Sequence, residues 1–423
     1  MLAYLRHPIA PVVYWFIGIV TAVLAAIWLI PSAGTGDVGV YEQIIENFRQ
    51  NGIAQLSTCI TVTCPGHTWN YPPLYLVILF LGQLVGGSLL DNFSLHKMII
   101  SLFYGAAMGA LAWFSYVTRP HDRSPVRSII RGLFLGFTGL ALLLNSYGLG
   151  YIDVYMYPFI ILCFVFLHKE NYLYSGFLFA CGFLMKWMPI LMLPLILLYL
   201  LRRGVKSLGL FLLGVSIPVL TTGLLSWGYD FVSDYLRGAS AITNDPYFAA
   251  SPTLPWLYTM VFPQRINGLP DSLLIYLDAS TKTPAIMMQY TAFKFAFLGY
   301  YAWVLYTFHR VAATKRTLRP LLVAATYAYL GYFFIASGVH ENHLMIGVLC
   351  ALLLSVMSTR HERLYRSVDS MSAISMLLFY GVSGTPFFPV EKASIAYPLF
   401  VTVFLTAWFI ALVMQFKKQL ASA

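Results

Sequence analysis

Residues 395–418 read IAYPLFVTVFLTAWFIALVMQFKK, an apolar run that ends in the basic pair Lys417-Lys418. A helix of about 20 apolar residues is long enough to cross the roughly 30 Å hydrocarbon core of a bilayer. Similar runs recur along the whole chain, which is 59% hydrophobic and only 10% charged. A soluble domain carries about 25% charged residues, so the composition predicts an integral membrane protein.

The apolar runs are predicted to be helices, because backbone polar groups in lipid must be satisfied within their own segment. The first run is longer than a signal-peptide core and lacks a small-residue cleavage site before Pro31, so it is expected to be a retained span. The apolar runs lie at 12–31, 74–90, 95–117, 132–149, 153–168, 172–187, 189–201, 208–227, 286–308, 320–338, 343–358, 370–384 and 395–415.

The positive charges indicate which runs cross, because cytoplasmic loops are enriched in Lys and Arg. The basic stretches lie at 119–131, 202–206, 310–319, 360–366 and 417–418. They share one side with Arg6 only if the run at 74–90 does not cross. Prolines at the start of that run and glycines at its end fit a helix that lies in, or dips into, the outer interface. We therefore predict an all-α polytopic membrane protein of 12 transmembrane helices, with both termini cytoplasmic.

The whole chain, 1–423, is expected to form a single transmembrane domain with two long outer loops. The first loop, 32–94, would carry the dipping helix and a second interfacial helix at 40–49. The second loop, 228–285, is rich in Pro, Tyr and Trp, as is usual at a membrane interface. No internal repeat of the kind found in many transporters is evident.

The net charge of +10 sits mostly in the short basic loops, so it requires no nucleic-acid partner. Among the five cysteines, Cys163, Cys181 and Cys350 lie in apolar runs and are expected to be inert packing residues. Cys59 and Cys64 fall in the first outer loop, where an oxidising compartment would permit a disulfide. Their spacing would also suit a metal, although no second Cys/His pair follows, and both alternatives stay open.

Most of the unusual polar residues gather on the predicted outer face. Asp37 follows Gly36 just beyond the first span, and Tyr71 precedes the paired prolines that open the dipping helix. The other candidates lie in the outer loops and turns or at the outer ends of apolar helices: Tyr41, Glu42, Asp153, Lys186, Arg237, Arg265, Lys294, His340, Glu341 and His343. Charges at membrane depth are costly and often mark function, so their gathering on one face favours a functional site.

Each candidate also has an ordinary structural interpretation. An aspartate beside glycine is commonly a turn or N-cap residue. Lys186, at the end of an apolar helix, could extend its ammonium to the interface. His340 and His343 could cap a helix or bind a metal, although no third ligand is evident in the sequence.

Four motifs, in this order, resemble those of the GT-C glycosyltransferases. They are Gly36-Asp37 followed by Tyr41-Glu42, Asn70-Tyr71-Pro72-Pro73-Leu74, the acid at Asp153, and Val339-His340-Glu341-Asn342-His343. These multispan enzymes take sugar from a polyprenyl-phosphate sugar, and the dolichyl-phosphate-glucose- or mannose-dependent transferases are the most similar. The resemblance covers most of residues 1–200 and the region around 340. The family's first outer loop also carries a helix that does not cross the membrane.

The resemblance implies an inverting transfer of a hexose or pentose to an acceptor hydroxyl, with Asp37 as general base. Cationic side chains, with Lys294 and His340 favoured, would stabilise the departing polyprenyl phosphate. No Asp-x-Asp accompanies Asp37, so a divalent metal is possible but not required, and no other cofactor is implied. The implied partners are the polyprenyl-phosphate sugar, a lipid- or glycan-linked acceptor and membrane lipids. The site would face outward (periplasmic) from the plasma (inner) membrane. The alternative is a transporter or flippase of a lipid-linked sugar.

Overall fold

The fold is known from a computed structural model that describes residues 27, 29–61, 72, 74–118, 125–225, 247–262, 274–277, 282–312, 317–380 and 396–423. Of these residues 84% are helical, which confirms the predicted all-α class. The strands of the described part, β1 (Tyr247–Ala250) and β2 (Leu274–Tyr276), form one antiparallel pair. The predicted span at 12–31, almost entirely, and Cys64 lie outside the described residues.

The described part of the chain is built mainly of helices. In chain order they are α2 (Gly36–Thr61), α3 (Leu74–Gly86), α4 (Asn92–Thr118), α5 (Pro125–Phe137), α6 (Leu140–Leu143), the π-helix η2 (Leu144–Gly148), the 3-10 helix η3 (Ile152–Met156), α7 (Tyr157–His168), α8 (Tyr172–Met185), the 3-10 helix η4 (Met188–Met192), α9 (Leu193–Leu201), α10 (Val205–Leu225), α12 (Leu254–Val261), α13 (Pro284–Ala312), α14 (Arg319–Ile335), α15 (Met345–Met357), the 3-10 helix η6 (Thr359–His361), α16 (Glu362–Tyr380) and α17 (Ala396–Ser422).

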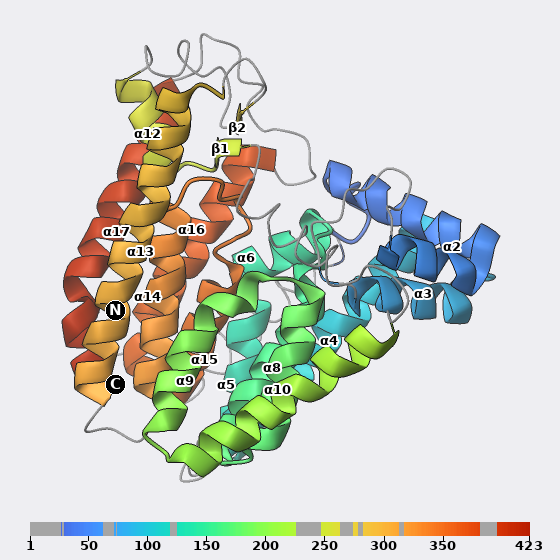
Figure 1. Ribbon diagram of the computed structural model, residues 1–423, viewed down its shortest axis with the longest axis horizontal. Coiled ribbons are helices and arrows are strands. Elements are labelled where there is room, and N and C mark those ends of the chain that lie inside the picture. The colour runs from blue at the N-terminus through green and yellow to red at the C-terminus, as the bar shows by residue number, and fades with distance from the viewer. Residues whose placement is uncertain are drawn as a thin grey trace, which may run out of the picture.

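Two groups of helices make up the bundle. In the first, α14 packs against α13, α15 and α17, and α15 packs against α16. In the second, α8 packs between α7 and α10, and α4 packs against α5 and α7. Figure 1 shows α2 and α3 projecting sideways from the second group, with β1 and β2 above the first. Helix α15 joins the two groups through contacts with α4, α5 and α7.

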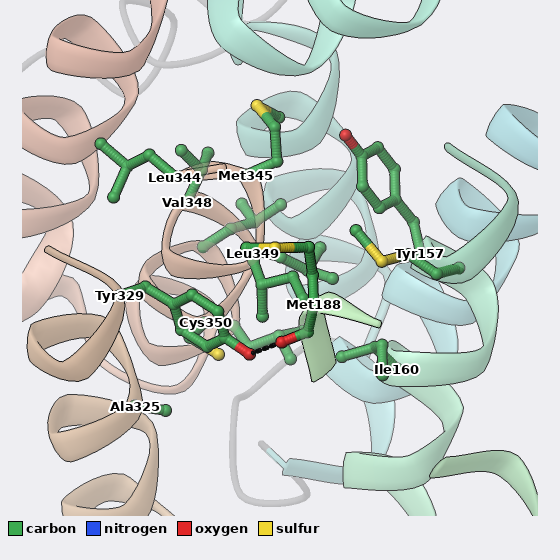
Figure 2. Close-up of a cluster of buried hydrophobic side chains, with 14 of the residues drawn as sticks. Tyr157, Ile160, Met188, Ala325, Tyr329, Leu344, Met345, Val348, Leu349 and Cys350 are labelled. Carbon is green, nitrogen blue, oxygen red and sulfur yellow. Dashed lines mark hydrogen bonds between the residues drawn. The ribbon is translucent and has the colours of Figure 1, made fainter. Parts of the chain in front are cut away.

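The core lies where α15 meets α14, α7 and η4 (Figure 2). Every residue of α15 is buried, as expected of a helix that is apolar on all sides. The hydroxyl of Tyr329 donates a hydrogen bond to the carbonyl oxygen of Met188 at 2.6 Å, so this buried phenol is satisfied. Cys163, Cys181 and Cys350 are buried free thiols, which confirms that they are packing residues.

Three described helices are long and apolar enough to cross a membrane: Asn92–Thr118, Val205–Leu224 and Pro398–Ser422. A fourth candidate is the pair Val126–Phe137 and Leu140–Gly148, which is bent by 61° at its break. Large apolar side chains are exposed on such helices, including Leu220 at 62% and Phe400 at 70%. These findings fit a helical membrane protein but not twelve full-length spans.

The prediction of twelve spans is wrong for two physical reasons. Several of the predicted runs form helices that are too short to cross: Ile152–His168, Tyr172–Met185, Met188–Leu201 and Met345–Met357. In addition, α13 and α16 are long enough but carry polar residues along their length, such as Lys294 in α13 and Arg366 and Asp369 in α16. Apolar composition alone does not show where a helix ends.

The expected first outer loop contains two helices. The interfacial pattern at 40–49 lies within α2, whose helical geometry is interrupted at Gly52, where φ is +59°. Helix α3 has 13 residues and rises about 20 Å, so it is too short to cross a bilayer. The side of the membrane on which α2 and α3 lie stays a prediction.

The close packing of α8 on α10 depends on two glycines. A Cβ atom on Gly176 would collide with the backbone at Phe211, and one on Gly214 with the carbonyl oxygen of Leu173. We therefore expect Gly214→Ala to lower the free energy of unfolding by about 1–3 kcal/mol, measured by denaturant unfolding in detergent. Gly209, on the same helix, has open space around it. Gly209→Ala should be neutral or stabilising, and equal losses in both variants would contradict the packing argument.

Candidate functional site

The loop before α2 holds Asp37 against the segment that follows η2. The backbone N–H of Thr35 donates to the carbonyl oxygen of Leu149 at 3.1 Å. Gly34 has φ +76°, and a Cβ there would lie 2.8 Å from that same oxygen, so glycine permits the close approach. Asp37 then lies in the first turn of α2, where the positive end of the helix dipole favours a carboxylate.

A buried ion pair lies at the centre of the site. The ammonium Nζ of Lys186 lies 2.8 Å from Oδ2 of Asp153, and the two side chains are only 3% and 1% exposed. The same oxygen accepts a hydrogen bond from Nδ2 of Asn342 at 3.2 Å. Asp153 lies in the first turn of η3. Lys186 is the residue at which α8 ends, and its backbone is extended. The ordinary interpretation of Lys186, a side chain that reaches the interface, is therefore wrong.

A second buried contact joins Tyr151 to Glu341. The Tyr151 hydroxyl donates to Oε1 of Glu341 at 2.5 Å, and the Lys186 ammonium lies 5.9 Å from the centre of the Tyr151 ring. Burial raises the pKa of Glu341 above its usual value, and the negative charge of Asp37 adds to that shift. His340 and the Tyr151 hydrogen bond oppose it. Asp37 and Glu341 are therefore electrostatic neighbours.

His340 and His343 contact each other, and among the residues that the structure describes they do not form part of a three-residue metal site. Nδ1 of His343 accepts a hydrogen bond from the backbone N–H of His340 at 3.2 Å, and the ring centres are 5.2 Å apart. The His343 ring stacks on Tyr332 at 5.8 Å. Burial lowers the pKa of His343, and the charges of His340 and Lys186 lower it further. Within the described residues no group of three or more potential ligands could hold a metal ion.

The structure therefore brings together six of the predicted residues: Asp37, Asp153, Lys186, His340, Glu341 and His343. Three other predicted residues, Tyr41, Glu42 and Lys294, are also described by the structure. Tyr41 is buried against the ring of His96 at 5.1 Å. Glu42 is partly exposed, and its pKa is raised by burial and by Asp91. Lys294 is partly exposed, with Nζ 4.2 Å from the centre of the Tyr290 ring. The remaining three, Tyr71, Arg237 and Arg265, lie outside the described residues.

From the sequence alone, no role in the site was assigned to Tyr151, Asn342, His96 or Lys97, although Asn342 lies within one of the quoted motifs. Lys97 is 3% exposed, and its ammonium donates to the carbonyl oxygen of Tyr147 at 2.7 Å. Nε2 of His96 lies 3.0 Å from the carbonyl oxygen of Gly150. A signal for Lys97 was present, because an ionisable residue inside a predicted span is a functional candidate by default. Tyr151 and Asn342 gave no such signal, since neither residue carries a charge.

No protein-family model matches this chain, and no curated protein is significantly similar to it. The site contains a half-buried carboxylate in the first turn of a helix, a buried carboxyl group, a buried ion pair and two histidines, all from segments that meet beside η2 and η3.

Proposed function

We propose that this protein is a glycosyltransferase of the GT-C type, which moves a hexose or pentose from a polyprenyl-phosphate sugar to an acceptor hydroxyl. One observation carries the proposal. Asp37 lies in the first turn of α2, just after the segment that bonds to Leu149, and its charge acts on Tyr151 and Glu341. Tyr151 in turn lies against the buried pair of Asp153 and Lys186. A base next to polar groups that can hold a substrate is the arrangement that such a transfer needs.

In the proposed reaction Asp37 takes the proton from the acceptor hydroxyl. The acceptor oxygen then bonds to the anomeric carbon from the face opposite the phosphate, and the bond from that carbon to the phosphate oxygen breaks. The configuration is inverted, and the polyprenyl phosphate leaves with the electron pair. The carboxylate must be ionised to act, and the helix dipole at the start of α2 favours the ionised form.

The departing phosphate gains negative charge, which a nearby cation can stabilise. His340 and Lys294 remain candidates, and the geometry adds Lys97. Within the described residues Lys97 forms no ion pair with a carboxylate, and its ammonium lies beside Gly150, next to Tyr151. A buried cation without an anionic partner is costly, and a bound phosphate would compensate it.

Lys97→Met should therefore weaken binding of citronellyl phosphate, a short polyprenyl monophosphate, by at least about tenfold, because a buried charge-assisted contact is worth about 1.5–3 kcal/mol. Thermal unfolding of the purified protein at increasing ligand concentration would measure this. Lys294→Met is the matched variant. A loss confined to Lys294→Met would assign the phosphate to Lys294 instead.

We further propose a multi-pass protein of the plasma (inner) membrane, with the site on the outer face and the basic stretches inside. Ser88 and Lys206 are both exposed. With Cys59 and Cys64 replaced by serine, Ser88→Cys should react with an impermeant maleimide on intact cells. Lys206→Cys should react only after the cells are opened. The reverse pattern would overturn this orientation.

The transferase proposal is tested by incubating the purified protein with a panel of polyprenyl-phosphate sugars and candidate acceptors. Release of polyprenyl phosphate, with formation of a glycosylated acceptor, is the expected result. The rival function, transport or flipping of a lipid-linked sugar, predicts that the donor crosses the bilayer of a proteoliposome with its phosphate–sugar bond intact.

A further inference from the structure

Five side chains of the site form a closed ring of contacts. Asp153 bonds to Lys186, which lies over Tyr151, and Tyr151 bonds to Glu341. Asn342, the residue after Glu341, closes the ring by donating to Asp153. All five side chains are buried.

Three oxygen atoms of this ring have no hydrogen-bond donor among the described residues. They are Oδ1 of Asp153, Oε2 of Glu341 and Oδ1 of Asn342. In each case the other polar atom of the same carboxyl or amide group is bonded within the ring. Buried polar atoms are almost always hydrogen-bonded, and each one left without a partner costs about 1–3 kcal/mol. Three such oxygen atoms on neighbouring side chains are therefore not expected of ordinary core packing.

The chemistry of these atoms restricts the class of ligand. All three are acceptors, so an anion such as a phosphate would be repelled, and a molecule with several hydroxyl donors would be bound. A metal ion fits poorly, because the Lys186 ammonium already neutralises Asp153 at 2.8 Å. A polyol, which carries several hydroxyl groups, supplies the neutral donors that these atoms lack.

We infer that Asp153, Glu341 and Asn342 bind the hydroxyl groups of the sugar carried by the donor lipid. The inference rests on the proposed function, since it assumes that a lipid-linked sugar reaches this site. The ring of five side chains would then bind the sugar, and the cationic side chains outside the ring would bind the phosphate. A site built to accept hydrogen bonds from hydroxyls discriminates strongly against a ligand that lacks them, because its acceptors then stay unpaired.

The test compares binding of citronellyl phosphate with binding of citronellyl-phosphate esters of glucose, mannose, galactose and arabinose, using the full-length protein in detergent. At least one sugar ester should bind about tenfold tighter than citronellyl phosphate. Asn342→Ala and Glu341→Gln should each reduce that preference to about threefold or less. Deoxy forms of the preferred ester, each lacking one hydroxyl, should bind the parent protein more weakly than the full ester does. The variant that lacks the side chain contacting that hydroxyl should bind the full and deoxy esters equally well.

Thr406→Val is the matched control, because the Thr406 hydroxyl is also buried with no hydrogen-bond partner in the described part of the chain, but it lies in α17. It should keep the full sugar preference. If no ester binds better than citronellyl phosphate, or if the preference survives in both ring variants while they remain folded, the inference is overturned. Tighter binding induced by Ca²⁺ or Mg²⁺, and lost in the ring variants, would overturn it in favour of a cation site. Sugar preference without any turnover would support the ring but refute the transferase.

Discussion

Asp37→Asn should lower turnover by about 10²–10⁴-fold while leaving donor binding nearly unchanged. Asparagine keeps the size of the side chain and one acceptor oxygen, but it cannot take a proton from the acceptor hydroxyl. General-base catalysis contributes about this factor, and its loss affects the chemical step rather than binding. Single-turnover release of polyprenyl phosphate at saturating donor would measure the change, and donor-dependent thermal stabilisation would report binding.

The neighbouring carboxyl groups supply the controls. Asp153 is already paired with Lys186, and Glu341 already accepts a hydrogen bond from the Tyr151 hydroxyl. Both carboxyl groups are therefore already engaged by neighbouring side chains, and Asp37 remains the proposed base. Glu341→Gln and Asp153→Asn should impair donor binding or positioning more than the chemical step. Folded Asp37→Asn protein with more than a few per cent of parental turnover, beside an inactive Glu341→Gln, would transfer the role of base to Glu341.

The sequence was sufficient to predict the helical class and the grouping of six polar residues. It was insufficient for the spans, because helix ends depend on tertiary contacts. The run at 132–149 illustrates this. It breaks before Leu140, where the Asp369 carboxylate accepts the backbone N–H groups of Leu140 and Ala141 at 3.1 Å each. The buried cap on the second segment comes from α16, more than 200 residues away in the chain.

Local sequence patterns also could not predict which side chains pair within the site. Tyr151 and Glu341 are separated by 190 positions in the chain, and Asp153 and Asn342 by 189. Sequence motifs placed Asp153 and Glu341 on one face, but only the packing of η3 against α8 and of the 336–344 loop beside them decides which atoms pair. Lys186 shows the difference, since its position at a helix end suggested solvent contact and its actual partner is buried.

Lys186→Met should lower the free energy of unfolding by about 3–5 kcal/mol. Among the residues that the structure describes, the substitution leaves the buried Asp153 carboxylate with one hydrogen bond, from Asn342, and no cation. Removing one partner of a buried ion pair costs about this much, because the remaining charge keeps its desolvation penalty without the compensating attraction. Denaturant unfolding of the purified protein in detergent would measure the loss.

The double variant Asp153→Asn/Lys186→Met separates charge from packing. With both charges removed it should recover most of the lost stability, since replacing a buried pair by neutral groups is often nearly neutral. The pair of Arg203 and Glu170 provides the comparison, because Glu170 is 61% exposed there. Glu170→Gln should cost no more than about 1 kcal/mol. If Lys186→Met is equally mild, or if the double variant is no more stable than Lys186→Met, the Asp153 charge does not depend on Lys186 for its compensation.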